Sequence, residues 1–227
     1  MLRAFEIGFV MISVLALFSV PLAFSDPHDD SHDDSHNNSS VICIGVLPPG
    51  IHEKVVVPKG ETCTISGASL VLKNVKVQKG ATLLVFAGVI NGNIDLKKES
   101  NLYMFEGIVG KSVKGKQTDN VIIAEGSQVK KVSITKGTGE TAIVDSVIEK
   151  NVKISKQKDG FVFIKDNEIG GNLKVEKGDT EISSFIKSNI IGGNLDCKKN
   201  SPPPLSEGFI NTVSGDKKHQ CSADLGF

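Results

Sequence analysis

The chain has 227 residues, enough for one sizeable domain, and its formal net charge of +0 at pH 7 gives no indication of binding to nucleic acid or to an anionic membrane. It contains no Trp, one Tyr and a single Arg, so it offers few aromatic anchors and guanidinium groups for bases, phosphates or sugars. We therefore expect no nucleic-acid partner. The 23 Gly and the many Val and Ile favour short strands and turns.

The N-terminus is typical of an export signal. Arg3 supplies a positive charge, residues 7–18 are apolar, and Ala23 and Ser25 are small residues at the spacing that signal peptidase requires. The pattern predicts a signal peptide over residues 1–25 and a secreted or cell-surface protein. An uncleaved membrane anchor is the alternative, because the apolar run approaches the ~18 residues that a membrane span needs.

Residues 26–40 read DPHDDSHDDSHNNSS and contain no apolar side chain except that of Pro27. Such a segment cannot contribute to a core, and we expect it to be disordered. His28, His32 and His36 recur every four residues among Asp residues, and imidazole with carboxylate can bind Zn, Ni or Cu. One hypothesis is a metal-sequestering segment; the other is a solvated spacer.

From residue 54 onward, a short apolar-x-apolar motif recurs every 19 to 22 residues. Alternate residues of a strand point to opposite faces, so stacked copies would form continuous inward columns. The first inward column is expected to hold Val55, Val75, Ile94, Val113, Val132, Val152, Leu173 and Leu195. The second is expected to hold Val57, Val77, Leu96, Gly115, Ile134, Ile154, Val175 and Cys197. The residues between the two columns are mostly Lys, Asp and Ser, which predicts a solvated outer face.

Each interval also contains two further apolar clusters separated by Lys-Gly and Gly-Gly turns. The sequence therefore predicts an all-β fold over residues 41–221: a single-stranded parallel β-helix of about eight coils, with three short strands per coil and a short tail at 222–227. A helical repeat is excluded, because the apolar runs have a period of two and Gly interrupts them. A β-sandwich is the remaining alternative.

Four cysteines follow the predicted signal, and an even number in an exported chain indicates disulfides. Cys43 and Cys63 are 20 residues apart, or one coil, so Cys43 is expected directly above Cys63. The longer final interval pairs Cys197 with Cys221 and would align Leu195 with His219. We expect these disulfides to close the two ends of the solenoid.

Asparagine precedes the motif in most coils. The column comprises Asn74, Asn93, Asn151, Asn172 and Asn194. Stacked amides can hydrogen-bond along the axis at a coil corner, so we interpret the column as structural rather than as a ligand site.

Catalytic patterns are missing from the sequence. Nothing matches a phosphate-binding loop, H-E-x-x-H, G-x-S-x-G or C-x-x-C, and the coils leave little room for the loops that would build a cleft. The outward carboxylates Asp95 and Asp196 are predicted to lie about five coils apart, or about 24 Å, too far for a glycosidase pair. No catalytic residue and no cofactor is predicted.

The repeated G-N-[VIL]-x-[VIL] motif and the Lys-Gly turns over residues 54–197 resemble exported right-handed parallel β-helix repeat proteins of bacteria and archaea. The short coils also resemble bactofilins, which are polymer-forming β-helical scaffold proteins. The resemblance implies the architecture, while the signal peptide and the closed ends depart from bactofilins. The leading functional hypothesis is a non-enzymatic structural or adhesion module. The alternatives are carbohydrate binding or processing, with a cell-envelope polymer or polysaccharide as partner, and metal sequestration through the histidine segment.

Overall fold

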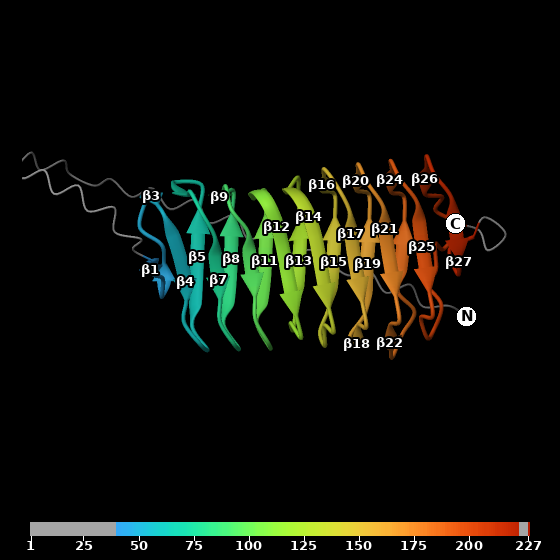
Figure 1. Ribbon diagram of the computed structural model, residues 1–227, viewed down its shortest axis with the longest axis horizontal. Helices are drawn as coiled ribbons and strands as arrows, with labels where there is room; N and C mark the ends of the chain where they lie inside the picture. The colour runs from blue at the N-terminus through green and yellow to red at the C-terminus, as the bar shows by residue number, and fades with distance from the viewer. Residues whose placement is uncertain (1–39, 223–226) are drawn as a thin grey trace, which may run out of the picture. The chain divides into compact units, whose positions relative to one another are not determined.

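The computed structural model describes residues 40–222 and residue 227. These residues form an all-β parallel solenoid of about nine coils, and no helix occurs among them (Figure 1). The predicted signal peptide and the histidine segment with His28, His32 and His36 lie outside the described residues. Ser40, expected in the disordered segment, is part of the first strand because it pairs with Lys54.

Face 1 of the solenoid is built from the recurring motif. Its strands are β1 (Ser40–Ile42), β4 (Lys54–Val57), β7 (Val75–Val77), β10 (Ile94–Leu96), the second halves of β12 (Ile108–Lys116) and β14 (Gln128–Thr135), β17 (Val152–Ser155), β21 (Leu173–Glu176), β25 (Leu195–Lys198) and β27 (Lys217–His219). Val75 pairs with Ile94 and Val132 with Val152, all with no exposed surface, so the predicted inward column is confirmed.

Face 2 carries the longer apolar runs. Its strands are β2 (Gly45–Val46), β5 (Thr62–Ser66), β8 (Thr82–Phe86), β11 (Asn101–Phe105), β13 (Val121–Ala124), β15 (Thr141–Val144), β19 (Val162–Lys165) and β23 (Phe185–Lys187), which form one parallel sheet in that order. The register advances by one coil at each step, as where Leu102 lies between Leu83 and Val121.

Face 3 completes each coil with short strands. They are β3 (Gly50–His52), β6 (Ser69–Val71), β9 (Val89–Ile90), the first halves of β12 and β14, β16 (Val147–Ile148), β20 (Glu168–Ile169), β24 (Ile190–Ile191) and β26 (Thr212–Val213). Two further strands, β18 (Lys158–Asp159) and β22 (Asp179–Thr180), pair at the corner between faces 1 and 2. The three faces enclose one continuous apolar core.

Both predicted disulfides are present, with Cα–Cα distances of 5.5 Å for Cys43–Cys63 and 5.2 Å for Cys197–Cys221. The predicted strand register around the cysteines, however, was wrong at both ends. Gly45, not Cys43, lies opposite Cys63, because the first coil is short and pairs Val41 with Val55. Each disulfide therefore joins residues that are not paired across the strands, at the first and last coils.

The last coil also differs from its predicted register. Leu195 pairs with Lys217, and His219 lies opposite Cys197, because the 22-residue spacing continues and Cys221 follows the end of β27. The partial coils β1 and β27 lack a complete motif, which is why the structure has about nine coils instead of eight. Phe227, expected in a tail, is 5% exposed and belongs to the core.

Candidate interaction surface

The outer side of face 2 is apolar. Every second residue of its strands points inward, and the residues between them lie on the surface with partial exposure, as the alternating burial of β8 and β11 shows. The first outer column holds Leu84, Tyr103, Ile122, Ala142, Phe163 and Phe185, in register from coil to coil. The second holds Phe86, Phe105, Ala124 and Val144. The second column continues from Val144 to Lys165 and Lys187, and the outward residues of β5 are Thr and Ser. The apolar strip therefore extends from β8 to β23, with these two lysines at its C-terminal end.

Aromatic rings pack against one another within these columns. The rings of Phe86 and Phe105 are stacked with centroids 5.6 Å apart, although Phe86 remains 46% exposed. Phe163 and Phe185 meet edge to face at 6.2 Å, and the Lys187 ammonium lies 5.6 Å from each ring centroid. These contacts fix the ring orientations, so the apolar surface is preorganised.

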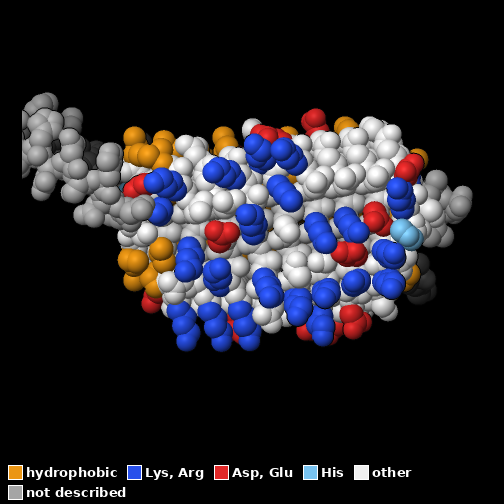
Figure 2. Space-filling view, in the orientation of Figure 1, with side chains coloured by type: hydrophobic (Ala, Val, Ile, Leu, Met, Phe, Trp, Pro, Cys, Tyr) orange, Lys and Arg blue, Asp and Glu red, His pale blue; other side chains and the backbone are white. Residues whose placement is uncertain are grey.

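A column of lysines borders face 2 where each coil turns from face 1 into face 2. We call it the lysine edge; its members are Lys136, Lys156, Lys177 and Lys199. All four are exposed and have φ between 57° and 59°, and none of them forms an ion pair with a carboxylate of the described residues. Lys156 and Lys158 also line an open depression of about 360 Å³ at this corner. Figure 2 shows blue side chains in a row along the lower edge of the rod.

Carboxylates border face 2 on its opposite side, where each coil turns into face 3. We call this column the acidic edge; its members are Glu106, Glu125, Asp145 and Asp166. They are exposed, with φ between 46° and 56°, and follow β11, β13, β15 and β19 directly. Asp166 pairs with Lys165 at 2.9 Å. Face 2 is therefore an apolar strip between a positive and a negative margin.

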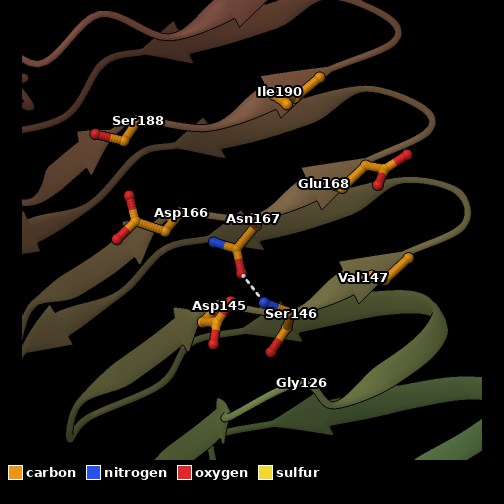
Figure 3. Close-up of a pocket in the computed structure, with 9 residues that line it drawn as sticks. All are labelled: Gly126, Asp145, Ser146, Val147, Asp166, Asn167, Glu168, Ser188 and Ile190. Carbon is orange, nitrogen blue, oxygen red and sulfur yellow. Dashed lines mark hydrogen bonds between the residues drawn. The ribbon is translucent and has the colours of Figure 1, made fainter.

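A depression beside the acidic edge contains several carboxylates. It holds about 360 Å³, is open to solvent, and is lined by Asp145, Asp166 and Glu168 among others. Figure 3 shows Glu168 extending from β20 on the opposite side from Asp166, so the carboxylates diverge. Among the described residues no group of three or more His, Cys, Asp or Glu side chains could hold a metal ion.

Asparagines form two kinds of axial ladder. In the predicted column, Asn172 Oδ1 accepts a hydrogen bond from the Asn194 N–H at 2.7 Å, and Asn74 Oδ1 accepts one from Asn93 N–H at 2.8 Å. A second ladder, formed by Asn167, Asn189 and Asn211, lies inside the corner under the acidic edge and is at most 2% exposed. In the predicted column each amide oxygen accepts from the coil that follows, whereas in the interior ladder it accepts from the coil that precedes; both are structural uses of the side chain.

The outer surface of face 1 is polar and holds ion pairs. Glu176 accepts from Lys153 at 3.0 Å and from Lys174 at 3.1 Å. Partial burial would raise the pKa of Glu176, but the hydrogen bonds and charges of the two lysines outweigh it and hold that pKa below its usual range. Asp196 lies five coils from Asp95, as predicted, and its Oδ1 is 2.9 Å from His219 Nδ1. The Lys153–Glu176 and His219–Asp196 contacts link adjacent coils.

Comparison with known proteins gave no family model, no curated protein and no solved structure that matches this chain. Among the described residues no helix is long and apolar enough to cross a membrane. The surface itself is therefore the basis for a functional conclusion.

Sequence reasoning missed the apolar exterior of face 2. The runs TLLVF at 82–86 and NLYMF at 101–105 were interpreted only as further inward clusters. These runs are apolar at both even and odd positions, and that pattern could have indicated an apolar exterior. A strand with one face in water would instead alternate apolar and polar residues.

Proposed function

We propose that this protein is a non-enzymatic structural or adhesion module that contacts its partners through the flat sides of a rigid rod. The observation that carries the proposal is face 2, a preorganised apolar strip along the rod with charged margins. An apolar area of this extent on a soluble surface is characteristic of contact with other molecules. The open depressions and diverging carboxylates argue against a catalytic cleft.

Export fits this role. The two disulfides are consistent with an oxidising compartment, and the predicted signal peptide would deliver the chain there. N-terminal sequencing of the mature protein from the native cell envelope or medium tests this point. A mature chain that begins at Asp26 supports export, and one that retains Met1 in the cytoplasm contradicts it.

The absence of turnover is tested by incubating the full chain with a panel of envelope polysaccharides and measuring new reducing ends. We expect none above the buffer control. Turnover that persists through repurification, and that is lost on Asp145→Asn or Glu168→Gln, would contradict the non-enzymatic proposal.

Carbohydrate binding is the second candidate, because aromatic side chains lie along one side of the rod. Tyr103, Phe86 and Phe105 would supply ring faces on adjacent coils. A glycan array with the native chain and with Tyr103→Ala decides this point. The matched control is Ser133→Ala on face 1, which should leave any binding unchanged.

A further inference from the structure

We propose that two copies of this chain associate through face 2, with the two-fold axis parallel to the rod axis. The lysine edge of each copy then lies against the acidic edge of the other. This inference goes beyond the proposed function, since it specifies one occupant of the apolar strip and the orientation in which it binds.

Face 2 has the longest apolar strip of the three faces. On face 3 the outward residues Ile51, Leu70, Val89 and Ile108 form a shorter apolar column, which ends at Gln128. On face 1 the residues that alternate with the inward columns include Lys76, Asp95, Lys114, Ser133 and Lys153, all polar. On face 2 the corresponding residues from β8 to β23 are Leu84, Tyr103, Ile122, Ala142, Phe163 and Phe185. A sheet with one hydrated side alternates apolar and polar residues, whereas one covered on both sides has continuous apolar runs. The strands of face 2 have the second pattern.

The size of the strip fits a weak, reversible dimer. The six strands from β8 to β23 have three to five residues at ~3.3 Å each, on average about 14 Å, and at ~4.8 Å spacing they span about 29 Å. The product is about 400 Å² per copy and about 800 Å² for a pair, which is the size of a weak, transient contact. Parallel sheets with flat, ordered aromatic side chains can pack face to face at ~10 Å.

The charged margins select one of two orientations. A two-fold axis parallel to the rod axis exchanges the left and right margins, so each lysine edge meets an acidic edge. An axis along the strands would reverse the rods and place lysine edge against lysine edge. Like charges in contact across an interface oppose association, so the first arrangement is favoured.

The charges match at two successive coils, whereas at β11 the margins hold Glu99 and Glu106, both acidic, with Glu99 paired to Lys79 and Lys98. Lys136 precedes β15 and Asp145 follows it, so a two-fold axis along the rod brings Lys136 of one copy level with Asp145 of the other. Lys156 and Asp166 flank β19 in the same way. The rod therefore presents complementary pairs at two successive coils on each margin.

The first experiment is sedimentation equilibrium of the full chain, with and without Ile122→Lys in the centre of the strip. The matched control is Ser133→Lys, an outward strand position on polar face 1. We expect a dimer for the native chain and the control, and a dissociation constant at least about tenfold higher for Ile122→Lys. Circular dichroism and disulfide mapping confirm that each variant folds.

The second experiment exchanges the margins. Lys136→Glu with Lys156→Glu gives one variant, and Asp145→Lys with Asp166→Lys gives the other. Each is expected to dimerise more weakly alone, while an equimolar mixture recovers a heterodimer, since both margins then pair opposite charges. The backbone tolerates these exchanges, because both Glu and Lys already occupy equivalent positions with φ near 57°.

Higher salt should weaken the native dimer and strengthen each variant homodimer. A chain that stays monomeric up to about 100 µM would overturn the proposal. So would a dimer that Ile122→Lys leaves unchanged. A lysine-to-glutamate variant that dimerises as tightly as the native chain would show that the lysine edge does not meet the acidic edge, and would overturn the proposed orientation.

Discussion

Replacing Asn189 with Ala tests the interior ladder directly. Asn189 is 1% exposed, and its Oδ1 accepts from the Asn167 N–H at 3.1 Å and from Asn167 Nδ2 at 2.9 Å. Its Nδ2 donates to the Ile164 carbonyl at 2.9 Å. The substitution leaves two donors on Asn167 without their acceptor in the core. Each buried donor without a partner costs about 1–3 kcal/mol. A water that enters the site offsets part of the cost of the two donors, so we expect a loss of about 3 kcal/mol in the free energy of unfolding.

Asn172→Ala is the matched control. Asn172 also accepts from an adjacent coil, through the Asn194 N–H at 2.7 Å, but it is exposed, so water can replace the lost acceptor. We expect a loss of about 0.5–1 kcal/mol. Urea unfolding of both variants, with disulfides intact and at one protein concentration, measures the difference. Equal losses for the two variants would refute the claim that burial makes the interior ladder the stronger structural element.

Two further predictions concern the ends and the pH response. Cys43→Ser opens a disulfide-closed loop of 20 residues, so we expect the free energy of unfolding to fall by about 3 kcal/mol. Amide hydrogen exchange should become faster in the first coils only, and unchanged protection of those coils would contradict the prediction. Burial raises the pKa of Glu140, so its ionisation opposes folding, and this contribution to stability declines as pH rises through the raised pKa. Glu140→Gln should therefore raise the melting temperature at pH 7 but not near pH 3, as measured by calorimetry, and the opposite ordering would be inconsistent with that shift.

The repeat was sufficient to predict the solenoid because inward side chains must recur once per coil. Val75, Ile94 and Val152 have a fixed spacing in the sequence and share one line in the core. The two disulfide pairs followed from the same spacing, since their cysteines are about one coil apart.

The ends could not be predicted in detail, because the first and last coils lack the repeat. The short first coil moves Cys43 away from Cys63 along the strand direction, and Lys217 replaces an apolar residue at an inward position in the last coil. No periodic signal marks either change.

The interior ladder was missed for a different reason. Asn167, Asn189 and Asn211 occur in sequences that read as ordinary turns, and each is preceded by a residue of a different kind. Only the corner geometry shows that their amides point into the core. The apolar exterior of face 2 could not be predicted without the corner geometry either, because the position of each turn decides whether a side chain points into the core or outward.

The central claim is that successive coils stack along one axis at a constant rise. Spin labels at Lys76→Cys and Lys153→Cys are four coils apart on face 1, and labels at Lys76→Cys and Lys218→Cys are seven coils apart. Pulsed electron paramagnetic resonance, with labelled chain diluted into unlabelled chain, should give distances near about 19 Å and about 34 Å. Two distances that do not increase with the number of coils would contradict the solenoid.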